Sequence, residues 1–214
     1  MPARVDRRMP LQNRVTPFGD LVAVPSRGLF MGNRGGRFHT DARTLTSRRW
    51  ASRQWICCVL DFKGRHRDVW GRFYTELFFL DEPTALAAGH RPCFECRRKE
   101  ALAFAARWQT AFRLTARPRA DEMDVVLHEQ RLCGRAKRLH RRDVDALPDG
   151  ALIATEEGAF AVRGKSLLRW TPDAYDDCRP KSRGAKVDVL TPPAILAILS
   201  AGYQPHWHPS AARF

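Results

Sequence analysis

The order of apolar and polar positions predicts short strands interrupted by a few helices. The clearest strand in the first half is 73–80, Phe-Tyr-Thr-Glu-Leu-Phe-Phe-Leu, because its aromatic and apolar residues favour a half-buried pleated surface. A helix of about two turns should follow, since Asp81 can cap its free N–H groups and Pro83 fits its first turn. Gly89 can adopt the left-handed conformation that ends this helix.

Two hairpins are predicted before that strand. In the first, Asn33-Arg-Gly-Gly supplies turn residues between short strands at 28–31 and 37–40. In the second, a strand at 54–62 turns near Lys63-Gly64 and returns over 65–70. Successive side chains of a strand point to opposite faces, so Cys57 and Cys58 should lie on opposite sides of the second hairpin's first strand.

Helical periodicity predicts two helices in the middle of the chain. The first spans about 100–114, and its apolar stripe consists of Ala101, Phe104, Ala105, Trp108 and Phe112. The second runs from a cap at Asp121 to about Leu132, with Asp124 in its first turn.

The last third has the pattern of a small sheet with one helix. Apolar runs separated by turn residues predict strands at 151–155, 159–163, 166–170 and 186–190. Thr191 is the expected cap of a helix over 194–200 that Gly202 ends. The whole chain is therefore expected to be α+β, with small antiparallel sheets, a C-x-x-C knuckle and packed helices. The Pro-containing break near 118 divides it into 1–118 and 119–214.

The C-x-x-C pair gives the strongest indication of chemistry. Cys93 and Cys96 follow the short predicted helix directly, where a tight turn can aim two thiolates at one cation. Such a turn is half of a tetrahedral zinc site. Six cysteines in 214 residues fit a reducing compartment and a metal site better than a disulfide framework.

The strand, short helix and Ala-Gly-His-Arg-Pro-Cys-x-x-Cys-Arg sequence resembles the last third of Ada-like zinc-binding domains. More loosely, 30–39 is similar to the strand and His that begin such modules, so the resemblance covers about 30–98. It implies zinc and a role in DNA repair, because in that family four cysteines hold zinc and one accepts a methyl group from a DNA phosphotriester. The family's first pair is C-x-x-x-C, whereas this chain has the adjacent Cys57 and Cys58.

The other two zinc ligands are expected among a few residues. Cys58 and His39 are the first candidates beside Cys93 and Cys96, with Cys57 as the alternative to Cys58 and with His66 and His90 as alternatives to His39. A separate cluster, His206 and His208, has the spacing of two side chains on one side of an extended segment, which can bind a metal or act as general bases.

Positive charge is concentrated on both sides of the cysteine element. The net charge is +14; residues 1–72 hold 15 Arg and Lys against 5 Asp, and residues 97–143 hold 13 against 6 Asp and Glu. Arginine forks pair with phosphates, so a nucleic acid is the expected partner, and the resemblance favours DNA over RNA. The expected contacts are Arg34, Arg37, Arg97, Arg98, Lys99, Arg135, Lys137, Arg138, Arg141 and Arg142.

Three functions fit this sequence. The first is a zinc-containing nucleic-acid-binding protein, and the second is an enzyme acting on nucleic acid through a metal-activated cysteine or water. The third is a metal-free module that binds an acidic partner. No complete catalytic pattern such as H-E-x-x-H is visible, which favours binding. No apolar run reaches membrane-helix length and no secretory signal is recognisable, so a cytoplasmic protein is expected.

Overall fold

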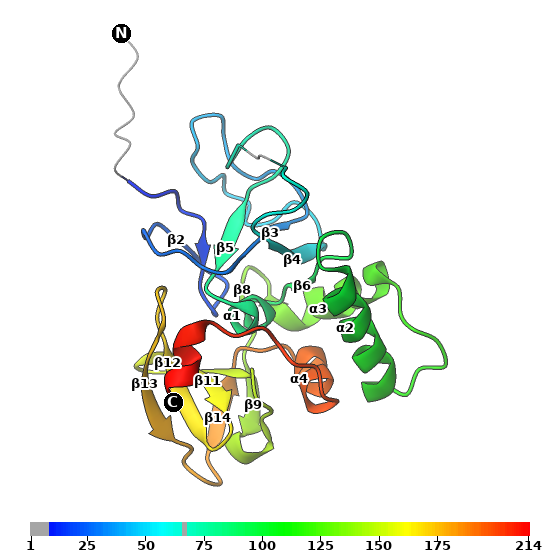
Figure 1. Cartoon of the computed structure of the whole chain (residues 1–214), viewed down its shortest axis with the longest axis vertical. Helices are drawn as coiled ribbons and strands as arrows, with labels where there is room; N and C mark the ends of the chain where they lie inside the picture. Colours follow the sequence, from blue (N-terminus) through cyan, green and yellow to red (C-terminus); the bar gives the residue numbers. More distant parts are fainter. Residues whose placement is uncertain (1–8, 66–67) are drawn as a thin grey trace.

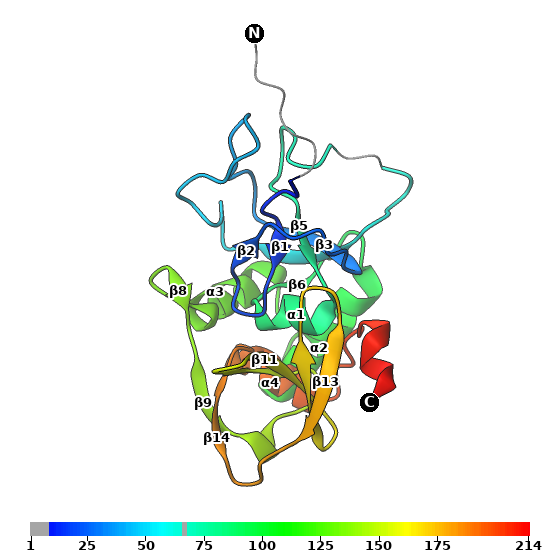
Figure 2. The same cartoon turned by 90° about the vertical axis from the view of Figure 1, so that its left-hand side faces the viewer.

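Two six-stranded sheets lie at opposite ends of the molecule, with the short helix α1 (Glu82–Ala87) between them and the longer helices to one side (Figures 1 and 2). The structure is a computed structural model that describes residues 9–65 and 68–214. Its mixture of small sheets, mostly antiparallel in their pairing, and helices confirms the α+β class.

The N-terminal sheet is built around β3, a strand whose five residues are all buried. The strand order is β2-β1-β5-β3-β4-β6, and β3 pairs antiparallel with both β4 and β5. The pairs β1–β5 and β4–β6 are parallel. The strands are β1 (Arg14–Val15), β2 (Leu21–Val22), β3 (Phe30–Arg34), β4 (Trp55–Val59), β5 (Leu77–Phe79) and β6 (Arg91–Pro92).

Both predicted hairpins are wrong in their pairing. Strand β3 continues through Arg34 and pairs with β4, not with 37–40, because β4 supplies a partner for all five of its residues. Gly35 and Gly36 do have positive φ angles, but they lead into a loop. In the second hairpin, Arg65 and residues 68–70 belong to no strand, and residues 66–67 lie outside the described part.

Helix α1 (Glu82–Ala87) forms as the sequence predicts. The Asp81 side chain accepts hydrogen bonds from the Thr84 backbone N–H at 3.0 Å and the Thr84 hydroxyl at 2.7 Å, and Pro83 occupies the first turn. Gly89 has a φ of 87°, which supports the predicted left-handed end. All six residues of α1 are buried, since both sheets and the other helices pack around it.

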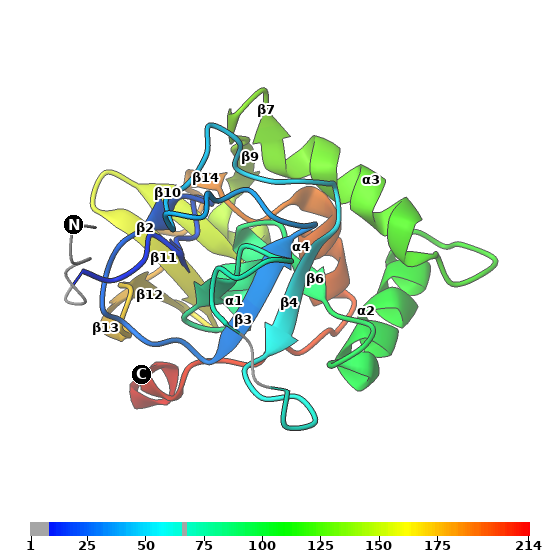
Figure 3. The same cartoon turned by 90° about the horizontal axis from the view of Figure 1, so that it is seen from above.

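The other helices occur where periodicity predicts them, but their caps differ. Helices α2 (Arg98–Ala111) and α3 (Ala120–Arg131) follow one another at an angle, joined by a loop (Figure 3), and α4 (Pro193–Ser200) packs against both. The cap of α3 is Arg119 rather than Asp121, with the Arg119 N–H bonded to the Glu122 carboxylate at 2.6 Å. The cap of α4 is Pro192, because the Thr191 hydroxyl instead accepts a hydrogen bond from the N–H of Leu152.

The C-terminal sheet has the order β13-β12-β11-β10-β14-β9. The sequence pattern does not predict its edge strand β13, because Tyr-Asp-Asp-Cys-Arg-Pro has little apolar character. The basic segment 135–142 contributes strand residues to β8 and β9. The strands are β7 (Leu132–Cys133), β8 (Ala136–Lys137), β9 (His140–Asp143), β10 (Leu152–Thr155), β11 (Gly158–Arg163), β12 (Ser166–Trp170), β13 (Tyr175–Pro180) and β14 (Lys186–Val189), and β7 pairs with β8 alone. Two 3-10 turns complete the chain, Val144–Ala146 and Pro209–Arg213.

Apolar contacts cross the division predicted near residue 118. One cluster joins Leu86 of α1 and Phe104 of α2 with Leu127 of α3 and Ile198 of α4. A second joins Leu80 and Ala87 to the C-terminal sheet. The two parts therefore share core material, and α1 is the element that contacts both. Within the described ranges, no helix has the length and hydropathy needed to cross a bilayer.

Candidate metal centre

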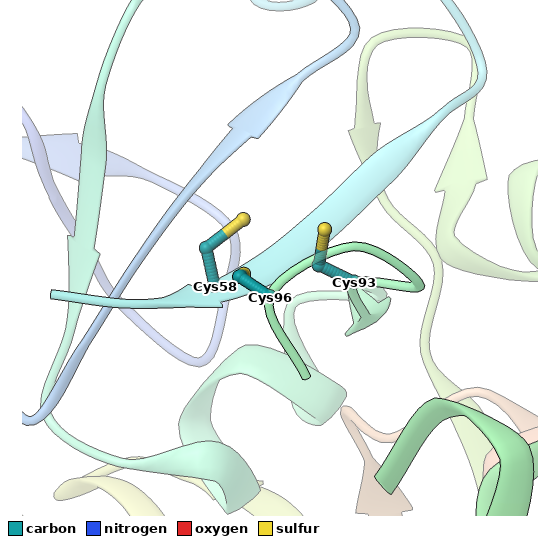
Figure 4. A group of neighbouring side chains, drawn as sticks. All are labelled: Cys58, Cys93 and Cys96. Atoms are coloured by element: carbon teal, nitrogen blue, oxygen red, sulfur yellow. The ribbon is translucent and has the colours of Figure 1, made fainter. Parts of the chain in front are cut away.

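Three cysteine sulfurs from two distant segments meet beside the β4–β6 pair. Cys58 projects from β4, whereas Cys93 and Cys96 belong to the turn between β6 and α2 (Figure 4). The three sulfurs lie within 4.8 Å of one another. Cys58 and Cys93 are buried and Cys96 is partly exposed, so the cluster is mostly shielded from solvent but can be reached from one side.

The parallel pairing of β6 with β4 places these residues. After Gly89 ends α1, the chain returns along β4, and the Cys93 N–H donates to the Cys57 carbonyl at 2.9 Å. The next turn is closed by the Arg97 N–H, which bonds to the Cys93 carbonyl at 3.0 Å, and α2 begins immediately afterwards. This turn folds Cys96 back toward Cys93 and Cys58.

The surroundings of Cys93 favour a thiolate. Hydrogen bonds from the Cys58 and Cys96 thiols lower the pKa of Cys93, and the Glu95 N–H adds another at 3.4 Å. The same bond to Cys93 raises the pKa of Cys58, which retains its proton. The start of α2 adds a positive dipole end nearby, which also stabilises negative sulfur. A metal cation can replace the protons that the three sulfurs share.

Cys57 lies on the opposite face of β4, as strand alternation predicts. It is fully buried, and the Arg97 guanidinium donates to its Sγ at 3.4 Å. Burial raises the pKa of the Cys57 thiol. Of the two adjacent cysteines, the cluster therefore contains Cys58 and excludes Cys57.

The structure does not bring His39 to the cysteines, so this predicted ligand needs correction. Its Nδ1 hydrogen-bonds the Thr75 hydroxyl at 2.8 Å, its Nε2 bonds the Gly71 carbonyl at 3.1 Å, and its ring stacks on Trp70. Both ring nitrogens are engaged in holding the loop that follows β3. The alternative His90 is buried between Trp55 and Phe79 and lies outside the cluster. His66, the other alternative, falls outside the described residues.

The donor set fits zinc. Sulfurs bound to one tetrahedral zinc at about 2.3 Å stand about 3.8 Å apart, so the observed cluster needs only small side-chain adjustments. Thiolates select zinc or other soft metals over calcium and magnesium. Three protein sulfurs leave one tetrahedral position for a further ligand. A cavity of about 340 Å³ is lined by all three cysteines together with Tyr74 and Glu95.

The predicted nucleic-acid contacts range from buried to exposed residues, and Lys137 is partly buried with its ammonium bonded to the Ala87 carbonyl. Arg34 and Arg97 are buried, and Arg97 forms an ion pair with Glu82 at 2.9 Å. Arg37 is partly covered and pairs with Asp41. These positions are corrected from surface contacts to internal or paired ones. The exposed members are Arg98, Lys99, Arg135, Arg138, Arg141 and Arg142.

The two tail histidines serve packing and capping. The His206 N–H donates to Glu82 at 2.9 Å, and its ring meets the edge of Phe30. The His208 Nδ1 hydrogen-bonds the Ser210 hydroxyl at 2.8 Å at the start of the last 3-10 turn. Neither belongs to the candidate metal centre.

Comparisons with protein-family models, with curated proteins and with solved structures found no match for this chain.

Proposed function

We propose that this chain is a zinc-containing protein that binds nucleic acid. The observation that carries the proposal is the convergence of Cys58, Cys93 and Cys96, which are separated in sequence but lie within 4.8 Å of one another. Zinc would join β4 to the turn that starts α2 and so support the fold of the N-terminal half. Its remaining ligand is water, a substrate group or a further side chain, for which His66 stays the sequence-based candidate.

The nucleic-acid part of the proposal is supported by the exposed cations. Arg98 and Lys99 open α2 two and three residues after Cys96, where helix N-terminal N–H groups also favour phosphate. A second group lies along β8 and β9, namely Arg135, Arg138, Arg141 and Arg142. DNA is preferred to RNA because of the Ada-like motif.

The metal is tested by elemental analysis of tag-free protein and of two matched variants. Cys58→Ser should lose zinc, whereas Cys57→Ser, its neighbour on the opposite face of β4, should retain about one zinc per chain. Equal zinc in both variants would contradict the assigned ligand set. A folded parent without any metal would favour the alternative of a metal-free module that binds an acidic partner.

Nucleic-acid binding is tested by titrating labelled DNA and RNA of equal length at several salt concentrations. Phosphate contacts release counterions, so the affinity should fall steeply with salt and depend little on base sequence. The double variant Arg98→Gln, Lys99→Gln should weaken binding. It should also reduce the slope of log affinity against log salt concentration by the amount expected for the loss of up to about two phosphate contacts. Absence of binding by the zinc-loaded parent at low salt would end this part of the proposal.

An enzyme acting on nucleic acid is the second candidate, and the cavity of about 340 Å³ at the three cysteines favours it. In this hypothesis a cysteine thiolate attacks the alkyl carbon of a phosphotriester, so that an S–C bond forms, the C–O bond breaks and a phosphodiester anion leaves. Intact-protein mass after incubation with alkylated DNA tests it. A mass gain of one alkyl group on Cys58, Cys93 or Cys96 supports the enzyme. An unchanged mass contradicts it and leaves nucleic-acid binding as the proposed function.

A further inference from the structure

A second cavity, of about 570 Å³, is lined by five cationic side chains. They come from four parts of the chain: β3, the loop before β4, the end of α3, and the β7–β8 hairpin. Aromatic Trp50 and Trp55 line it as well, and Asp20 is its one carboxylate among the described residues. The five cations are Arg34, Arg49, Arg131, Arg135 and Lys137.

Among the described residues these five side chains lack a carboxylate in direct contact, although Asp20 lies near Arg34 and Asp124 near Arg131. In the described ranges none of them forms an ion pair within 4 Å. Arg34 is only 2% exposed and Arg131 is fully buried. Buried arginine is normally paired with an acid, because burial of an unpaired charge is costly.

Backbone carbonyls fix the two buried guanidinium groups in place. Arg34 donates to the Gly19 carbonyl at 2.8 Å, and Arg131 donates to the Gly89 carbonyl at 2.9 Å and to the Arg53 carbonyl at 2.7 Å. These bonds satisfy N–H groups, but neutral carbonyls do not neutralise the positive charge of the guanidinium groups. The buried Nε of Arg131 has no hydrogen-bond partner among the described residues.

Packing holds the same groups rigidly. The guanidinium carbons of Arg34 and Arg131 lie 4.0 and 3.9 Å from the ring centre of Trp55. Gly89 leaves room for Arg131, since a Cβ at position 89 would stand 2.6 Å from the Arg131 Cδ. A site whose charges are fixed before binding loses little entropy when a ligand arrives.

Electrostatics shows that the cavity disfavours further positive charge. Burial is the main cause that lowers the pKa of Arg34 and of Arg131 to about 9, and it outweighs the attraction of Asp20 and Asp124. Burial and repulsion from Arg34 and Arg131 lower the pKa of Lys137 to about 7. A bound anion would offset both effects.

We propose that this cavity binds a nucleoside phosphate, either free or at the end of a nucleic acid chain. Arg49, Arg135 and Lys137, the less buried of the five cations, hold the phosphate, because guanidinium forks and an ammonium are the usual partners of phosphate oxygens. The buried charges of Arg34 and Arg131 add attraction from behind them. The cavity volume is within the range of sites for small molecules and exceeds what one phosphate fills. Trp50 is only partly buried and offers an indole against which a base can stack. This inference uses different residues from the metal centre and does not depend on it.

The test is calorimetric titration of the full chain with adenosine 5′-monophosphate, adenosine and inorganic phosphate at one salt concentration. We expect the monophosphate to bind at least tenfold more tightly than either part alone. Lys137→Met, which keeps the aliphatic stem, should weaken binding about tenfold or more. Arg183→Gln removes an exposed cation elsewhere and serves as the charge-matched control, with affinity unchanged.

Two oligonucleotides that differ only in a 5′-phosphate or 5′-hydroxyl distinguish the sources of the ligand. Tighter binding of the phosphorylated strand, lost in Lys137→Met, indicates a nucleic acid end. Equal binding of both strands, with retained binding of the monophosphate, indicates a free nucleotide. The proposal is overturned if the folded parent binds neither the monophosphate nor the phosphorylated end selectively, or if Lys137→Met and Arg183→Gln behave alike. Repeating the titration with Cys58→Ser separates this outcome from failure of the metal centre.

Discussion

Arg97 and Glu82 form a buried ion pair, with 2.9 Å between guanidinium nitrogen and carboxylate oxygen. Arg97 follows Cys96 directly, and Glu82 is the first residue of α1. Glu82 also accepts hydrogen bonds from the Tyr203 hydroxyl at 2.7 Å and from the His206 N–H. The pair thus connects the turn that carries two of the clustered cysteines to the helix that contacts both sheets.

Removal of Arg97 should destabilise the protein strongly. Arg97→Ala would leave the Glu82 carboxylate buried without its cation, and breaking a buried pair in this way costs about 3–5 kcal/mol. Denaturant unfolding measures the loss, and Arg98→Ala, an exposed neighbour, is the control with an expected change below about 0.5 kcal/mol. Similar values for the two variants would show that the pair contributes no more than a surface charge.

The proposed zinc predicts that a chelator lowers the stability of the protein. A ligand at about 1,000 times its Kd stabilises the folded state by about 4 kcal/mol, so a strong chelator should lower Tm markedly in the parent. The chelator should leave Cys58→Ser unaffected, because that variant lacks the site. Thermal scans with and without chelator measure the difference, and an equal shift in both proteins would count against a structural metal.

The two sheets should unfold together, since α1 packs against the N-terminal sheet and is hydrogen-bonded to the C-terminal sheet. The Tyr175 hydroxyl on β13 donates to Asp81 at 2.9 Å, and the Trp170 indole N–H donates to the Thr84 hydroxyl at 2.9 Å. Tyr175→Phe removes one of these bonds at a buried carboxylate and should cost about 1–3 kcal/mol. Coincident transitions by fluorescence and circular dichroism are expected in parent and variant. Two separate transitions would support independent units on either side of residue 118.

Stability should rise with pH through Lys137. Burial, together with repulsion from Arg34 and Arg131, lowers its pKa from the ordinary 10.5 to about 7 in the folded chain, so between these values the unfolded chain binds more protons. The free energy of unfolding then increases as pH rises across that window, and below it the unfavourable burial of the charge is fully present. Lys137→Met should lack this contribution. Urea unfolding of parent and variant at several pH values measures the difference, and parallel pH profiles would contradict the lowered pKa.

Local sequence patterns determined much of this fold. Helix α1 is defined by nearby residues: the Asp81 cap, Pro83 in the first turn, and Gly89 after its end. The apolar stripe of α2 follows from helical spacing alone. Strand alternation was enough to separate Cys57 from Cys58, because neighbouring side chains on a strand must face opposite ways. The C-x-x-C turn likewise indicated which two cysteines belong together.

Only the tertiary structure decided which distant residues meet. Strand β3 pairs with β4 and β5 instead of folding into a local hairpin, which leaves His39 bonded to Thr75 and Gly71 and away from the cysteines. The same packing buries Arg34 and gathers it with Arg131 and Lys137 in one cavity. Local propensity is set by neighbours along the chain, whereas burial and charge clustering depend on long-range packing that no short pattern contains. The candidate metal centre therefore combines both: the knuckle was visible in the sequence, and its third sulfur was selected by the parallel pairing of β4 and β6.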